Sequence, residues 1–261
     1  SSSVFVAMCD TTVNPKVRIQ VRAANDTDAR ALSVATTVGI TVGSYGQSNS
    51  AYRGQVSATS HNVSNAYTWS DDASSVWQGG TSTTTTRSQL WATQIAAASG
   101  IPCGVVITGV GSASIALLTT DFWPGTVAKL DLAQATGYIS AWLWTQGESE
   151  SNGAGVFDVT AYRSNFDVLL GLLRGAVAVN NSVPVGVCVI GKKADAHISG
   201  QAFGDANWSS ARATLFGLTD KPGTYIATNL SDSVMVDELH YVADAYVENG
   251  RRAGLSMRKA L

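Results

Sequence analysis

From residue 38 to the end of the chain, short apolar runs alternate with longer segments that have helical periodicity. The apolar runs have the length of β-strands and lie at 38–42, 104–108, 138–144, 183–190 and 225–227. Strands that are covered on both faces have this composition, because neither face meets water. Between these runs, helices are expected over 87–98, 160–178, 207–216 and 241–260. Alternating strands and helices imply parallel pairing with right-handed crossovers, which predicts a three-layer α/β/α sandwich around a central parallel sheet.

The first 36 residues follow a different pattern. Two short strands are expected over 4–8 and 17–22, and turn-forming residues join them. A piece of this size does not easily build a hydrophobic core of its own. We therefore expect residues 1–36 to be an N-terminal β extension that packs on the main domain at 37–261, or to be the tail of a larger upstream module.

Composition and charge exclude several classes of protein. The chain has 261 residues and a formal net charge of −2, with no cluster of more than two adjacent basic residues, so a nucleic-acid partner is not expected. No apolar run is long enough to span a membrane, which takes about 18 residues or more. Only 14% of the residues are charged, against roughly 25% in typical domains. Because a Ser-, Thr- and Asn-rich surface is common in exported proteins, we predict an extracellular or virion-surface location.

Cysteines and histidines give no sign of a metal site. The three cysteines, Cys9, Cys103 and Cys188, permit one disulfide at most, and buried thiols are the expected state of the last two because both lie in strand-like runs. The three histidines are scattered along the chain and make a poor zinc site. No metal or other cofactor is predicted.

Polar residues follow three of the predicted strands immediately. The loops are Gly46-Gln47-Ser48-Asn49, 109–114 and Gln146-Gly147-Glu148-Ser149, and a fourth block, Asp237-Glu238-Leu239-His240, precedes the last helix. In open parallel sheets the chemistry lies beyond the carboxyl ends of the strands. These four blocks are therefore the predicted active site.

Ester cleavage would explain this set of residues. A serine hydroxyl such as Ser48 needs a base to take its proton, and histidine is the best suited base near neutral pH. Asp237 lies three residues before His240 and can hold the imidazole ring. His197, in the loop after strand 183–190, is the rival base. His61 lies in the polar stretch 54–85, which is expected to be a long surface excursion, so this histidine is expected at the surface.

The four blocks resemble those of the SGNH hydrolase superfamily, in particular its sialate O-acetylesterase and carbohydrate esterase family 6 branch. The similar segments are Gly46–Asn49, 109–115, 144–150, and 237–241 followed by Tyr246 and Gly250-Arg251. The chain departs from the usual pattern at Ser50, Val110 and Glu150, where the branch usually has Met, Gly and Asp. None of these changes removes a reacting atom, but they put the shape of the substrate in doubt.

The resemblance implies a flavodoxin-like SGNH fold and a role for each matching residue. The catalytic triad would be Ser48, His240 and Asp237. The oxyanion hole would consist of the Ser48 and Gly111 backbone N–H groups and the Gln146 side-chain amide, with Gly109 as the alternative to Gly111. Supporting residues would be Gln47, Asn49 and Glu148, the last as a buried hydrogen-bonding partner of the loops.

The activity that the resemblance implies is removal of O-acetyl groups from a carbohydrate, a polysaccharide or a sialic-acid-like glycan, through an acetyl-enzyme intermediate. Two alternatives remain open. The first is a general SGNH lipase, thioesterase or arylesterase, and the second is a non-catalytic glycan-binding module of a larger surface or phage tail protein. Four tryptophans in predicted loops either stack on the sugar or fill the core: Trp69, Trp77, Trp123 and Trp208.

Overall fold

The chain divides into two units, Ser1–Ile40 and Thr41–Leu261. The computed structural model describes residues 3–9, 16–23, 36–37, 40–51, 66–69, 77–79, 103–134, 139–152, 155–177, 182–191, 205–233 and 240–260. The helix expected over 87–98 lies outside these residues. No helix of the described part has both the length and the apolar character that crossing a membrane requires.

The first unit is a three-stranded antiparallel sheet in the order β1-β2-β3. Its strands are β1 (Ser3–Cys9), β2 (Lys16–Ala23) and β3 (Thr36–Thr37). β1 and β2 pair along their whole length, from Ser3 opposite Ala23 to Cys9 opposite Val17. The two strands expected from the sequence are therefore confirmed, whereas the role of this piece as an extension or a tail stays a prediction.

The second unit is built on a seven-stranded sheet in the order β10-β9-β8-β4-β7-β5-β6. The strands are β4 (Ile40–Gly46), β5 (Ala66–Trp69), β6 (Trp77–Gly79), β7 (Cys103–Ile107), β8 (Ala141–Thr145), β9 (Val185–Val189) and β10 (Thr224–Asn229). β4, β8, β9 and β10 pair in parallel, as do β5 and β7, whereas β6 pairs antiparallel with β5. β4 and β7 also run in parallel. The hydrogen bonds from Thr108 N to Ser44 O and from Val110 N to Gly46 O show this, because both partners advance toward higher residue numbers together.

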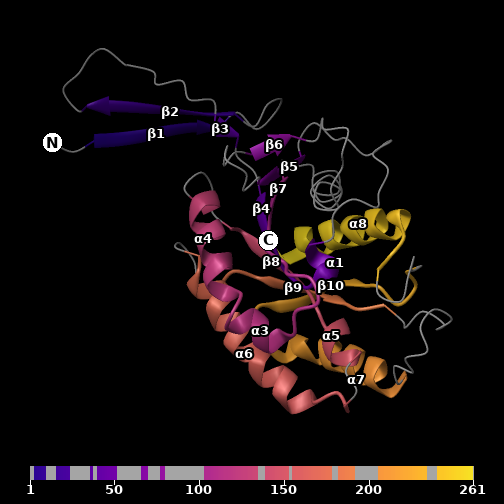
Figure 1. The fold of residues 1–261 in the computed structure, drawn as a ribbon. Helices are drawn as coiled ribbons and strands as arrows, with labels where there is room; N and C mark the ends of the chain where they lie inside the picture. Colours follow the sequence, from indigo (N-terminus) through magenta and orange to yellow (C-terminus); the bar gives the residue numbers. More distant parts are fainter. Residues whose placement is uncertain are drawn as a thin grey trace. The chain divides into compact units, whose positions relative to one another are not determined.

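The five central strands β7, β4, β8, β9 and β10 thus have the flavodoxin-like order 2-1-3-4-5 when numbered along the chain. The helices are α1 (Ser48–Ala51), α3 (Ile115–Thr119), α4 (Trp123–Gln134), α5 (Glu148–Ser151), α6 (Val159–Gly175), α7 (Asp205–Gly217) and α8 (Ala243–Ala260). Figure 1 shows α4, α6 and α7 on one face of this sheet and α8 on the other. The predicted three-layer α/β/α sandwich is confirmed.

The amphipathic helix α6 shows how the sequence builds one of these layers. Its stripe of apolar residues, Tyr162, Phe166, Leu169, Leu170 and Leu173, is buried. Asp158 caps the amino end, because its carboxylate accepts a 2.9 Å hydrogen bond from the Ala161 N–H. The Trp142 indole of β8 donates to the Leu173 carbonyl at 3.2 Å. Apolar burial and one directed hydrogen bond therefore fix the helix on the sheet.

Strand β4 extends four residues further than the sequence indicated, because the stretch from 43 was expected to be a loop. Residues 43–46 are buried within the sheet. A Cβ atom on Gly43 would lie 2.2 Å from the Trp142 ring, so the tryptophan packs where a side chain would otherwise stand. Glycine is uncommon in strands in general. Because packing against Trp142 requires a glycine at position 43, the sequence does not show that the strand continues there.

The polar stretch 54–85, expected to be a surface excursion, contains β5 and β6. β5 pairs with β7 and β6 pairs with β5, so this stretch extends the sheet beyond the five central strands. β5 and β6 are only four and three residues long and lie in a stretch rich in Ser and Thr, so they lack the longer apolar run that marks the other strands.

Candidate active site

The turn between β4 and α1 brings Ser48 to the carboxyl end of a central strand. Gly46 has φ = +141°, a backbone conformation that residues with a Cβ atom rarely adopt. A Cβ atom there would lie 1.9 Å from the Thr145 carbonyl oxygen. Next along the chain, the Gln47 N–H donates to the same oxygen at 3.0 Å. Glycine at position 46 therefore lets the end of β4 lie against β8, and Ser48 begins the helix directly after this contact.

His240 meets Ser48 at this turn. Its Nε2 atom lies 3.1 Å from the Ser48 Oγ atom, although the two residues are 192 positions apart in the sequence. Both side chains are partly buried, so they retain access to solvent. A nucleophile and a base within hydrogen-bond reach are the core of a serine hydrolase site. Asp237, His197 and His61 lie outside the described residues.

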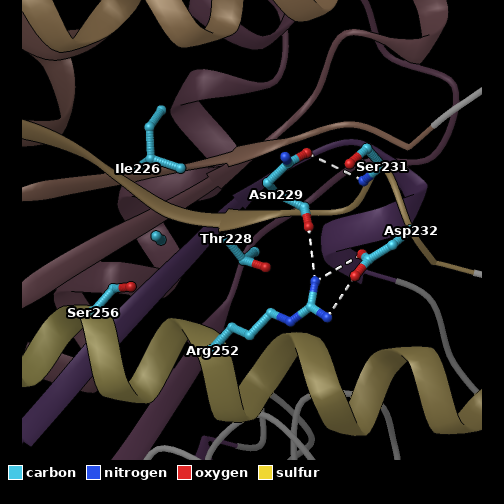
Figure 2. A pocket seen from close by; sticks show the side chains of 8 residues that line it. Ile226, Thr228, Asn229, Ser231, Asp232, Arg252 and Ser256 are labelled. Carbon is cyan, nitrogen blue, oxygen red and sulfur yellow. Dashed lines mark hydrogen bonds and ion pairs between the residues drawn. The ribbon is translucent and has the colours of Figure 1, made fainter.

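The end of β10 and the turn directly after it are fixed to α8. The Arg252 guanidinium binds Asp232 through two hydrogen bonds of 2.7 Å and donates to the Asn229 carbonyl at 3.0 Å. These side chains line a shallow groove between β10 and α8 (Figure 2). Hydrogen bonding to Arg252 lowers the pKa of the Asp232 carboxyl. The two charged residues of the groove thus neutralise each other, which indicates a structural brace.

The loop after β8 contacts the nucleophile loop through the predicted supporting residues. The Asn49 amide donates to the Glu148 carboxylate at 2.5 Å. The Ser149 backbone N–H donates to the Gln47 side-chain oxygen at 3.0 Å. Gln47, Asn49 and Glu148 are each at most 1% exposed, so these bonds are shielded from water. They join the two loops into one unit beneath Ser48.

Gln146 and Glu150 tie the loop after β8 to the loop after β7. The Gln146 amide nitrogen donates to a Glu150 carboxylate oxygen and lies 3.4 Å from the Ala113 carbonyl oxygen. The other Glu150 oxygen accepts a 2.6 Å hydrogen bond from the Ile115 N–H. Gly111 is exposed, and a Cβ atom there would meet nothing within 4 Å. In this structure the Gln146 amide therefore faces protein acceptors.

Glu150 was not among the predicted site residues. Desolvation by burial raises its pKa above that of an ordinary carboxyl. The signal that could have identified it is the spacing of Gln146 and Glu150, four residues apart, which allows their side chains to meet on one side of a helical turn.

The four tryptophans considered as sugar-stacking residues lie in different parts of the structure. Trp208 lies in α7, at the start of the helix expected over 207–216 and not in a loop, and it is 3% exposed, so it fills the core. Trp123 begins α4 and packs edge-on against Tyr45, with ring centroids 5.9 Å apart. Trp69 and Trp77 are register partners in β5 and β6, and their side chains lie outside the described part of the structure.

Cys103 and Cys188 are buried thiols outside any disulfide, whereas the side chain of Cys9 is not among those described. Among the described residues, no group of three or more His, Cys, Asp or Glu side chains could hold a metal ion.

Residues 44–259 match the family model of carbohydrate esterases described as sialic acid-specific acetylesterases. The chain belongs to this family. The match includes Ser48 and His240, whose side chains meet in the structure. The protein is therefore a carboxylic ester hydrolase of the carbohydrate acetylesterase class, which removes O-acetyl groups from carbohydrates.

Solved structures show the same fold at low sequence identity. A protein from Arabidopsis thaliana aligns with a TM-score of 0.64 and 19% identity, over 84% of this chain and 98% of that one. A carbohydrate acetylesterase from Xanthomonas citri aligns with a TM-score of 0.62 and 16% identity, over 91% of this chain and 59% of that one. The carbohydrate acetylesterase Est24 from Sinorhizobium meliloti has a TM-score of 0.53 and 13% identity, over 85% of this chain and all of that one. No curated protein sequence matches the chain significantly.

Proposed function

We propose that this acetylesterase uses Ser48, His240 and Asp237 as a catalytic triad and works through an acetyl-enzyme intermediate. The observation that carries the proposal is the 3.1 Å contact between His240 Nε2 and Ser48 Oγ. Asp237 lies three residues before His240, and it would accept a hydrogen bond from the other ring nitrogen. Such a bond holds the tautomer in which Nε2 is free to accept the serine proton.

The reaction then has two halves. His240 takes the Ser48 proton as the serine oxygen attacks the carbonyl carbon of the acetyl group, which forms a tetrahedral oxyanion. His240 next protonates the sugar oxygen, the bond from that oxygen to the acetyl carbon breaks, and the deacetylated sugar leaves. Water, deprotonated by His240, attacks the acetyl-enzyme and releases acetate as the proton returns to Ser48.

The developing oxyanion requires hydrogen-bond donors. The Ser48 and Gly111 backbone N–H groups would supply two, each worth about 3 kcal/mol of the barrier. Gln146 would join as a third donor only if its amide moved away from Glu150 and Ala113, to which it is directed here. Gly111 suits the role because its exposed position leaves space for a substrate.

The test is acetate release from p-nitrophenyl acetate and from acetylated xylan, sialic acids and bacterial polysaccharides. Ser48→Ala and His240→Ala should each lower kcat by at least about 10³-fold, and Asp237→Asn should lower it strongly. Ser256→Ala is the matched control, because this serine lies on α8 in the groove between β10 and α8. The activity of this variant should equal that of wild type. Full activity in Ser48→Ala would refute the triad.

A substrate series separates the acetylesterase from a general lipase or arylesterase. We expect activity to fall steeply from p-nitrophenyl acetate to longer acyl chains. Glycan binding without turnover would instead favour the non-catalytic module.

The N-terminal unit lies outside the family match, which begins at residue 44. This supports the proposal that it is an addition to the esterase domain. Secretion likewise stays a prediction.

A further inference from the structure

Tyr246 places one buried hydroxyl between two segments of the active site. It lies in the first turn of α8 and is fully buried. Its oxygen accepts a 2.8 Å hydrogen bond from the Tyr241 backbone N–H. The same hydroxyl donates its proton to the Asn49 side-chain oxygen at 3.1 Å. A single oxygen atom thus joins the chain near position 49 to the chain near position 241.

The two partners of this hydroxyl adjoin the reacting residues. Asn49 directly follows Ser48, and Tyr241 directly follows His240. The contact between His240 and Ser48 joins segments 192 residues apart. Other contacts between these segments must therefore keep the two side chains at a fixed distance. The Tyr246 hydroxyl bridges the immediate neighbours of both.

The directions of the hydrogen bonds are determined by their chemistry. The Tyr241 N–H can only donate, so the Tyr246 oxygen accepts from it and uses its own proton elsewhere. The Asn49 amide nitrogen donates to Glu148, which turns the amide oxygen toward Tyr246. The three hydrogen bonds through Tyr241, Tyr246 and Asn49 are therefore mutually compatible and have one consistent direction.

The Tyr241 end of the bridge is itself fixed. The Tyr241 hydroxyl accepts a 2.7 Å hydrogen bond from the Gly191 N–H, which follows β9. Its ring packs edge-on against the Tyr246 ring, with centroids 5.6 Å apart and planes at 88°. Both tyrosines and Asn49 are at most 1% exposed. The bridge therefore joins two rigid supports.

We propose that Tyr246 is a positioning residue for the reaction: its hydroxyl sets the distance and orientation between Ser48 and His240 without touching the substrate. The inference rests on the proposed function, because it assumes that these two side chains react. Small displacements of a base from its nucleophile reduce the rate strongly, since catalysis requires near-attack geometry.

The first experiment is Tyr246→Phe, which removes the hydroxyl and keeps the packing of the ring. With p-nitrophenyl acetate we expect kcat to fall about tenfold, equivalent to about 1.4 kcal/mol of transition-state stabilisation, and KM to stay within about twofold. The rate at which an organophosphonate inactivates the enzyme should fall by a similar factor, because that reagent reports the reactivity of Ser48 directly.

The matched control is Thr224→Val, which also loses a hydroxyl that donates within the protein. The Thr224 hydroxyl lies 2.6 and 2.7 Å from the Leu218 and Lys221 carbonyl oxygens, between which its one proton is shared. It stands at the amino end of β10, the opposite end of the strand from the site. We expect a similar lowering of Tm in both variants and a slower reaction only in Tyr246→Phe. Equal kinetics in the two variants would overturn the inference.

A double-mutant cycle with Asn49→Ala tests the bridge from its other end. If Tyr246 acts through Asn49, the double variant should be no slower than Asn49→Ala alone. Multiplication of the two losses would show independent actions and would overturn the inference. Wild-type kcat in Tyr246→Phe, together with an inactive Ser48→Ala, would refute the bridge alone. Activity in Ser48→Ala would refute the proposed function.

Discussion

Gly46→Ala should destabilise the enzyme more than any other change of one methyl group at this turn. The added Cβ atom would lie 1.9 Å from the Thr145 oxygen and 2.6 Å from its carbonyl carbon, more than an ångström inside an ordinary contact. Because the obstacle is backbone, the ends of β4 and β8 must separate. The positive φ of +141° adds strain, of order 1–3 kcal/mol, and overpacking adds a similar amount.

A total of about 4 kcal/mol lowers the Tm of a unit of roughly 220 residues by about 8–16 °C. The assay is thermal unfolding by circular dichroism, with kcat measured below the transition. Because the shift occurs two residues from Ser48, we also expect kcat to fall by about 10²-fold. Gly171→Ala is the control: it lies in α6 with nothing within 4 Å of its Cβ position, and alanine there should raise stability slightly. Unchanged Tm and kcat in Gly46→Ala would refute the steric argument.

Three further predictions concern burial. The first is Glu150→Gln, whose Tm should rise relative to that of wild type as pH increases from the usual carboxyl pKa to the raised pKa of Glu150. In this window the native wild type keeps the Glu150 proton while the unfolded chain loses it, so the wild type becomes less stable as pH rises. Native Cys103 and Cys188 should resist thiol reagents until the protein is denatured, since both are buried and burial raises the pKa of Cys103 to about 12. Trp208→Leu should lower the free energy of unfolding by roughly 2–4 kcal/mol without changing KM for an acetylated glycan, because the indole is in the core.

Each of these has a result that contradicts it. A constant Tm difference across the pH range would mean that Glu150 is not desolvated. Rapid labelling of the native thiols, measured by mass spectrometry, would show that they are accessible. A raised KM in Trp208→Leu at normal stability would restore the sugar-stacking role.

The sequence was most informative where burial imposes a periodic pattern. Helix α6 and strands β8 and β9 were predicted within three residues at each end that the structure describes, because their buried positions are apolar. The contact of Ser48 with His240 was also expected, because Ser48 follows a parallel strand, where the chemistry of such sheets lies, and His240 is the base that the resemblance pairs with it.

The sequence failed where a tertiary contact decides the local structure. Strand β4 has a glycine at position 43 because the Trp142 ring occupies the space where a side chain would stand. Likewise, the Gln146 amide donates to Glu150, which in the sequence stands out only as a departure from the usual aspartate. Contacts of this kind join elements far apart in the chain, so no local pattern reports them.

The 192-residue separation of Ser48 and His240 also bears on how the enzyme gains activity. The nucleophile follows the first strand of the central sheet, and the base precedes the last helix. Long loops must close before such distant segments meet, which slows folding. Hydrolysis should therefore begin only after the far end of the chain has docked. Recovered activity is then a sensitive indicator that refolding of the esterase domain is complete.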